Sequence, residues 1–167
     1  MKYHFFWGGI YSNWHKAPMT VNINGTDMLF NCGEQYMMYC KASLMNDKES
    51  LKEVMKTSDP RQQKKIGRNI KNFNSELWDK NKFAVMMIGL TEKFRQNPDL
   101  KKQLLEEDCD IFVEASPYDR IWGIGYLAQD AEDFVSDWGE NLLGKIITLI
   151  RFKLQAEEEN NSTIKNE

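Results

Sequence analysis

Two short segments carry the acidic and aromatic side chains that could act on a ligand. Residues 33–40 read GEQYMMYC and place Glu34 beside aromatic and thiol side chains. Residues 114–126 read EASPYDRIWGIGY and bring Asp119 close to Trp122, with two glycines following. A carboxylate can serve as a general acid or base, and an indole ring can stack on a flat heterocycle. These segments are therefore the first candidates for a functional site.

Each of these side chains also has a purely structural interpretation. Glu34 falls in the first turn of an expected helix, where the helix dipole favours a negative charge. Asp119 falls in a Pro-Tyr-Asp-Arg turn, and turn aspartates commonly bond to nearby backbone. Trp78 and Trp122 belong to a residue type that proteins mostly bury. Local spacing alone therefore leaves both an enzyme and a binding domain open.

The sequence offers few residues of the kinds that hold metals or cofactors. Its three cysteines, Cys32, Cys40 and Cys109, are odd in number and form no CxxC pair, and its two histidines, His4 and His15, lie near the N-terminus. This pattern favours free thiols in a reducing compartment over a zinc site. No P-loop, dinucleotide fingerprint, HExxH motif or nucleophile elbow is present. We therefore expect neither a metal nor a cofactor.

Length and composition predict one soluble globular domain. The chain has 167 residues, of which 41% are hydrophobic and 28% charged, with a formal charge of -3. This balance argues against a strongly basic nucleic-acid surface overall, although a local basic groove remains open. No apolar run reaches the ~20 residues of a membrane span, and the N-terminus does not resemble a secretory leader. We expect a cytoplasmic protein that does not bind membranes.

Hydrophobic spacing predicts a mainly helical α+β domain over residues 1–154, with a few short strands. The polar segment 155–167 lacks periodicity, so we expect a frayed tail there. The expected strands and helices are, in chain order, a hairpin of 20–23 and 28–30 around Asn24-Gly25, helices 33–44 and 48–56, a helix from Pro60 that ends before Gly67, helix 74–97, a helix beginning at Asn97-Pro98, strand 111–115 and a core helix from Asn141.

Taken together, five segments of the chain resemble the NADAR family, whose members are also called YbiA-like. The resemblance runs from Phe6 to about Leu154, with similar spacing throughout, and the order of the segments is that of the family. They read FFWGGIYSNWHKAPMTV, GEQYMMYCKA, IGRNIKNFNSELWDKNKFAVMMIGLTEKFRQNPDL, VEASPYDRIWGIG and DWGENLLGKIITLIR. Any one of them would be weak evidence, but five in order are specific.

This resemblance implies an N-glycoside hydrolase that breaks the bond between ribose C1 and a nitrogen, without an obligate protein partner. Some family members remove ADP-ribose from guanine in DNA and so reverse the action of a toxin. Others hydrolyse ribosylamino-pyrimidine phosphates, which are intermediates of riboflavin biosynthesis. A non-catalytic module that binds ADP-ribose or NAD is a further alternative. The absence of a fused synthesis domain and the Lys- and Asn-rich composition favour ADP-ribosylated guanine, with an antitoxin or anti-defence role.

The resemblance also assigns roles to individual residues. It implies that Glu34 and Asp119 are catalytic, dividing the work of base and acid between them. Gln35 stands where many relatives have histidine, so we expect no proton transfer at that position, and Gly33 replaces a common Ser or Val. The expected substrate-binding residues are Trp78, Trp122, Lys41, Arg68, Asn13, Gly123 and Asn141.

Overall fold

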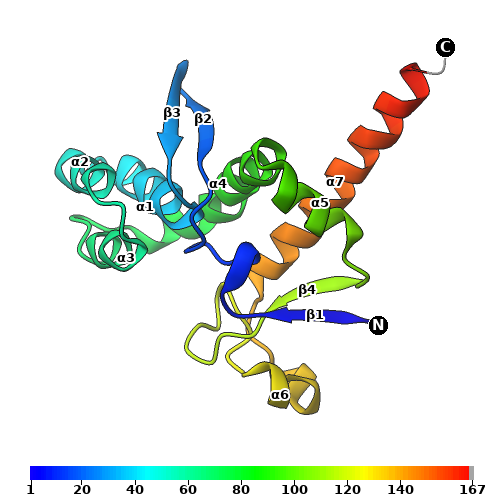
Figure 1. Ribbon diagram of the computed structural model, residues 1–167. Helices are drawn as coiled ribbons and strands as arrows, with labels where there is room; N and C mark the ends of the chain where they lie inside the picture. Colours follow the sequence, from blue (N-terminus) through cyan, green and yellow to red (C-terminus); the bar gives the residue numbers. More distant parts are fainter. Residues whose placement is uncertain (166–167) are drawn as a thin grey trace. The chain divides into compact units, whose positions relative to one another are not determined.

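The structure is a computed structural model that describes residues 1–165 (Figure 1). Its backbone divides into two compact units, each of which is described here by itself. The central unit comprises Asn13–Asn97, and the terminal unit combines Met1–Ser12 with the chain from Pro98 onward. The fold is α+β and mainly helical, as the hydrophobic spacing predicts.

The central unit begins with the expected hairpin. Strands β2 (Met19–Ile23) and β3 (Thr26–Phe30) pair antiparallel, with Ile23 opposite Thr26. Between them Asn24 and Gly25 adopt φ of 51° and 86°. Two positive φ angles in a two-residue loop match the twist of paired strands, which explains why this Asn-Gly pair turns the chain.

Four helices complete the central unit, and α1 lies among them. They are α1 (Gly33–Leu44), α2 (Lys48–Lys56), α3 (Pro60–Arg68) and α4 (Ser75–Gln96), which run from cyan to green in Figure 1. Helices α2, α3 and α4 all pack against α1, so eight of its residues are buried. The other three helices begin at side-chain caps, because Asp47, Asp59 and Asn74 each accept a hydrogen bond from a backbone N–H.

Helix α3 differs from its expected length. The sequence predicts that it ends before Gly67, but the helix continues through Gly67 to Arg68. A Cβ at Gly67 would lie 1.8 Å from Met38 Sδ on α1. The glycine is therefore a point of close helix–helix approach, not a helix terminator, and that contact sets the position of α3 on α1.

The inner face of α4 holds an unusual charge. Met86, Leu90 and Phe94 form a buried stripe, as their spacing predicts, and Lys93 is fully buried beside them. Burial lowers the pKa of the Lys93 ammonium to about 7, because the low-dielectric interior disfavours its charged form. Burial also lowers the pKa of His15, and the charge of Lys93 adds to that effect.

The terminal unit is built on a parallel pair of short strands. Strand β1 (Tyr3–Phe6) pairs with β4 (Ile111–Glu114), with Tyr3 opposite Ile111. Periodicity does not predict β1, because its pairing partner lies more than 100 residues away in the sequence. The remaining elements are η1 (Gly9–Tyr11), α5 (Pro98–Glu106), α6 (Ala128–Ala131), η2 (Glu132–Asp137) and α7 (Leu142–Ile164).

Helix α7 packs on β4 and on α5, and its apolar face follows the expected spacing. It stays helical up to Ile164 and so extends into the polar segment 155–167, for which the sequence predicts fraying. Positions 166–167 of that segment lie outside the described residues. Among the described residues, no helix has the length and apolar character required to cross a membrane.

Candidate active site

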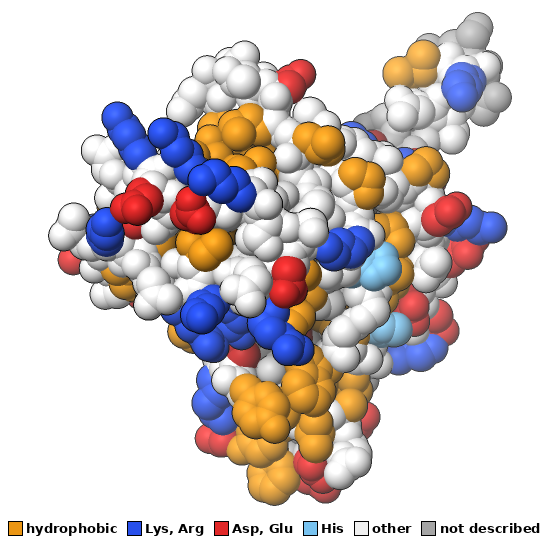
Figure 2. Space-filling model, turned by 60° about the vertical axis from the view of Figure 1, so that its left-hand side comes forward, with side chains coloured by type: hydrophobic (Ala, Val, Ile, Leu, Met, Phe, Trp, Pro, Cys, Tyr) orange, Lys and Arg blue, Asp and Glu red, His pale blue; other side chains and the backbone are white. Residues whose placement is uncertain are grey.

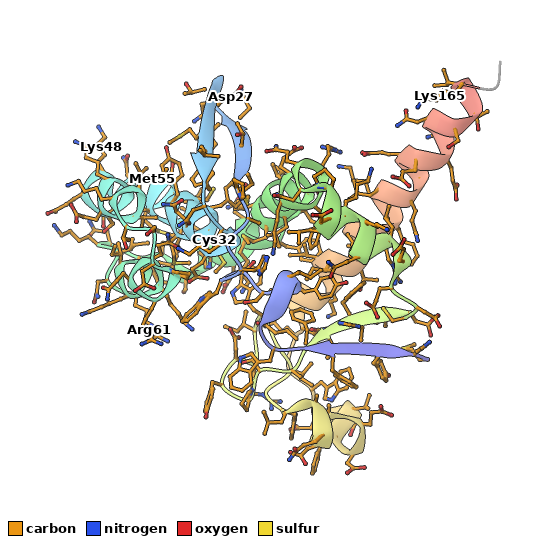
Figure 3. The ribbon with its side chains drawn as sticks, in the orientation of Figure 1. Asp27, Cys32, Lys48, Met55, Arg61 and Lys165 are labelled. Carbon is orange, nitrogen blue, oxygen red and sulfur yellow. The ribbon has the colours of Figure 1, made fainter. Side chains whose placement is uncertain are left out.

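In the central unit, Glu34 lies in the buried first turn of α1. Its residue is 4% exposed, and its backbone N–H donates to the carbonyl oxygen of Asn13 at 2.9 Å. Cys32 precedes the helix as N-cap without contributing a side-chain hydrogen bond to it (Figure 3). The helix dipole therefore acts on Glu34 without competition from a capping oxygen. A carboxylate held away from water is a strong electrostatic partner for a developing positive charge.

Asn13 contributes a buried acceptor that no protein group uses. The residue is 7% exposed, and its Oδ1 has no hydrogen-bond partner among residues 1–165. A Cβ at Gly33 would lie 2.7 Å from this oxygen, so the glycine leaves it room beside the start of α1. Native proteins rarely leave a buried acceptor unsatisfied. Asn13 also lies next to Glu34, because its carbonyl oxygen accepts from the backbone N–H of Glu34.

Lys41 and Arg68 bring positive charge to the same part of the central unit. Lys41 lies two turns after Glu34 on α1, and its Nζ donates to the carbonyl oxygen of Gly67 at 3.1 Å. The same Nζ lies 4.7 Å from the centre of the Phe73 ring. Burial lowers the pKa of Lys41, while Glu34 opposes this and Arg68 adds to it. The charges of Glu34 and Arg68 therefore both act on the Lys41 ammonium.

Gln35 and Trp78, which also belong to the central unit, are both buried. Gln35 accepts from the backbone N–H of Asn31 at 2.8 Å, and its amide donates to the carbonyl oxygens of Val54 at 3.1 Å and Thr57 at 3.3 Å. These bonds use both ends of the amide, which fits the expectation that position 35 transfers no proton. Trp78 is 7% exposed in the first turn of α4, so most of its ring is packed within the protein.

In the terminal unit, Asp119 organises the loop after β4. Its Oδ1 accepts hydrogen bonds from the backbone N–H of Ile121 at 2.8 Å and of Trp122 at 2.9 Å. This is the turn geometry that aspartate side chains commonly stabilise. The half-buried Trp122 is thereby held three residues after the carboxylate.

The start of α7 fixes the same loop from the other side. Backbone N–H groups of residues 140–143 donate to the carbonyl oxygens of residues 120, 123, 121 and 122 in turn, at 2.7–3.2 Å. The first backbone N–H groups of a helix have no acceptor within the helix, and at the start of α7 the loop provides acceptors for them. A Cβ at Gly123 would lie 2.8 Å from the carbonyl oxygen of Glu114, so this glycine allows the loop to fold closely on β4.

Asn141 links α7 to β4. Its Oδ1 accepts from the backbone N–H of Glu114 at 3.0 Å, and its Nδ2 donates to the carbonyl oxygen of Phe112 at 3.0 Å. Its backbone has φ of 51°, in the left-handed region where asparagine is tolerated better than most residues. Both ends of the amide are therefore occupied by the protein, and the contacts of Asn141 are those of a positioning residue.

The structure thus brings together two groups of the expected site residues, one in each unit. The central unit gathers Asn13, Glu34, Lys41 and Arg68, and the terminal unit gathers Asp119, Trp122, Gly123 and Asn141. The free acceptor of Asn13 had no local signal in the sequence, because only three-dimensional contacts show whether an amide is satisfied. Residues 1–165 contain no group of three or more His, Cys, Asp or Glu side chains that could hold a metal ion.

A comparison with protein families decides the classification. The NADAR domain matches residues 5–155, which is most of the chain. The chain belongs to the NADAR family. The NMR structure of the Escherichia coli protein YbiA has a similar fold, with a TM-score of 0.73 and 24% identity, covering 94% of this NADAR chain and 87% of YbiA.

Curated relatives of this NADAR protein come from a virus, an animal and a bacterium. N-glycosidase R617 of Acanthamoeba polyphaga mimivirus is 42% identical over 90% of this chain and 95% of its own length. Protein irg-1 of Caenorhabditis elegans is 36% identical over 78% of this chain and 63% of its own. A riboflavin biosynthesis protein of Vibrio vulnificus is 27% identical over 83% of this chain, which spans 34% of that longer protein.

The contacts of the two asparagines predict that alanine substitution destabilises the protein much more at Asn141 than at Asn13. Asn141→Ala removes two hydrogen bonds, leaves backbone groups of β4 unpaired and places alanine at a positive φ. We expect the free energy of unfolding to fall by about 2–4 kcal/mol. Asn13→Ala removes no side-chain hydrogen bond within residues 1–165, so we expect a loss below about 1 kcal/mol. Urea unfolding of both variants measures this difference, and equal losses would contradict the assignment of Asn13 to ligand binding.

Proposed function

We propose that this NADAR protein hydrolyses an N-glycosidic bond at ribose C1, and that its substrate is ADP-ribosylated guanine in DNA. The observation that carries the proposal is the buried Glu34 carboxylate beside the unsatisfied Oδ1 of Asn13 and the Lys41 ammonium. The relationship to a viral N-glycosidase, which covers 95% of that enzyme's length, supports the same reaction.

The chemistry fits a carboxylate at this place. As the C1–N bond lengthens, positive charge develops on the ribose ring, as in glycoside hydrolysis generally. Glu34 stabilises this charge and accepts a proton from the water that attacks C1, while the departing guanine nitrogen takes up a proton. The products are ADP-ribose with a hydroxyl on C1 and unmodified guanine, so atoms and charge balance without a redox step.

The cations and the asparagine account for recognition of the ADP-ribose part. Lys41 and Arg68 carry charge-assisted donors suited to the diphosphate. Asn13 Oδ1 accepts a hydrogen bond, which a ribose hydroxyl donates in this proposal. In the terminal unit Trp122 is a further candidate binding residue, held in place by the Asp119 turn and the start of α7, and an indole ring of this kind can stack on a flat base.

Hydrolysis of ribosylamino-pyrimidine phosphates is the alternative that a specific observation favours. A riboflavin biosynthesis protein shares 27% identity with this chain, and the same C1–N bond would break. A monophosphate needs fewer cations than a diphosphate, however, and here two cations act on the same corner as Glu34. A module that only binds ADP-ribose is less consistent with a carboxylate buried beside an unsatisfied acceptor.

Incubation with both substrates tests the proposed reaction. We expect free ADP-ribose and unmodified guanine from an oligonucleotide that contains ADP-ribosylguanine, detected by mass spectrometry. The ribosylamino-pyrimidine phosphate should be cleaved at least tenfold more slowly, because it lacks the diphosphate that Lys41 and Arg68 bind in this proposal. Faster cleavage of the pyrimidine substrate would replace the proposed substrate, and binding of ADP-ribose without cleavage of either would establish a binding module.

Two substitutions of Asp119 distinguish the effect of its negative charge from the effect of its hydrogen bonds in the loop. Asn keeps an oxygen that can accept from Ile121 and Trp122, whereas Ala removes it. If Asp119 shares the acid–base work, Asp119→Asn should unfold at the same urea concentration as the parent while kcat falls on the order of 10²-fold or more. Full activity of Asp119→Asn, combined with lower activity and stability of Asp119→Ala, would leave Asp119 a positioning residue of the loop.

A further inference from the structure

Helix α3 carries a row of positive charge along one face. Four cationic side chains stand at positions i, i+3, i+4 and i+7, a spacing that places them on the same side of an α-helix. These residues, which we call the α3 basic stripe, are Arg61, Lys64, Lys65 and Arg68. The stripe extends over eight residues, from Arg61 to Arg68, so its ends lie about 10 Å apart along the helix axis.

The stripe faces away from the protein interior. The opposite side of α3 is fixed to the rest of the central unit by the buried Gln63 and by Gly67, which meets Met38 of α1. Arg61, Lys65 and Arg68 are exposed, and Figure 3 shows Arg61 pointing away from the helix. Because the apolar contacts of α3 are directed at α1, the outer face is free to meet a charged partner.

The four cations of this face lack ion-pair partners in the part of the chain that the structure describes. Within residues 1–165, none of the four side chains forms an ion pair. Asp59 is the nearest acid in the sequence, and its side chain caps the helix by accepting from the backbone N–H of Arg61. Like charges three and four residues apart repel each other, and a cation in the first turn is disfavoured by the helix dipole. An external anion would relieve both effects.

An aromatic side chain and a wider field of positive charge accompany the stripe. Trp14 is 40% exposed, and Lys64 Nζ lies 5.9 Å from its ring centre. The central unit has 14 Lys and Arg against 9 Asp and Glu, a formal charge of +5, although the whole chain is at -3. Figure 2 shows Lys and Arg side chains gathered in groups on one face of the molecule.

We propose that the α3 basic stripe and Trp14 bind the single-stranded nucleic acid on which the modified guanine lies. This inference rests on the proposed function and extends it from the ADP-ribosylated base to the strand that carries it. A row of cations about 10 Å long can contact neighbouring phosphates of one strand, which supply most of the affinity for nucleic acid. Trp14 stacks on a neighbouring base, since an exposed indole beside cations is a common platform for single strands.

Lys41 links the stripe to Glu34, the carboxylate of the proposed reaction. Lys41 donates to the carbonyl oxygen of Gly67, within α3, and the charge of Arg68 acts on the pKa of Lys41. The C-terminal end of the stripe therefore lies at the corner that holds Glu34. A membrane surface fits this arrangement less well, because α3 has no outward apolar face to insert.

Charge reversal in the α3 basic stripe, with an equal charge reversal on α2 as the control, tests whether the stripe binds single-stranded DNA. The double variant Arg61→Glu/Lys65→Glu alters the stripe, and Lys48→Glu/Lys52→Glu makes an equal charge change on α2. Figure 3 shows Lys48 on the side of the helices away from Arg61. We expect the stripe variant to bind a fluorescein-labelled single-stranded DNA 12-mer at least tenfold more weakly, and the α2 variant to change affinity less than twofold.

Salt dependence and a second substrate distinguish the possible outcomes. The slope of log Kd against log salt should become shallower by roughly 1.4 in the stripe variant, as expected for two lost phosphate contacts. Its kcat/KM should fall at least tenfold on the ADP-ribosylated oligonucleotide and stay unchanged on ADP-ribosylguanosine.

Equal losses in both double variants, or equally tight binding of phosphatidylserine vesicles through the same residues, would overturn the inference. Binding of DNA through the stripe without release of ADP-ribose would instead refute only the proposed reaction.

Discussion

The burial of the first turn of α1 is the constraint on which the rest of the central unit depends. A carboxylate such as Glu34 loses its hydration there, so the fold must provide compensating charges and dipoles. The helix N-terminus and Lys41, two turns further on, supply them, and the charge of Glu34 acts on the pKa of Lys41. Helices α2, α3 and α4 pack against α1, and Glu34 in its first turn is buried. The features that make Glu34 costly to bury are thus the ones that make it effective on a cationic transition state.

In the terminal unit, hydrogen bonds hold the irregular loop after β4 in place. Backbone donors at the start of α7 and the side chains of Asp119 and Asn141 satisfy the loop and the end of β4. The bonds from the start of α7 join backbone atoms only, whereas those of Asp119 and Asn141 require their side chains. Gly123 is required for a different reason, since the close approach to Glu114 leaves no space for a Cβ.

Sequence periodicity predicts the long elements of this fold but not the contacts that define the site. The hairpin and α4 follow from local rules that concern neighbouring residues, the Asn-Gly turn and the apolar stripe. Strand β1 does not, because its identity as a strand comes from β4, more than 100 residues later. Likewise the glycine at position 67 reflects a close contact with Met38 of another helix, so a local rule wrongly predicts that α3 ends there.

The site residues show the same limit. Family resemblance points equally to Asn13 and Asn141, and only their contacts separate an unsatisfied acceptor from an amide bonded to β4. The spacing of Arg61, Lys64, Lys65 and Arg68 is visible in the sequence, but which face of α3 is buried is not.

A single-turnover measurement on Glu34→Gln tests the central claim most directly. Gln keeps the size and one acceptor oxygen of the side chain and removes its charge. With enzyme in excess over an ADP-ribosylguanine oligonucleotide, we expect the substrate to bind as before, while ADP-ribose release slows on the order of 10²–10⁴-fold because the carboxylate is lost. Release at the rate of the parent protein, with equal binding, would show that the buried carboxylate does not carry the reaction.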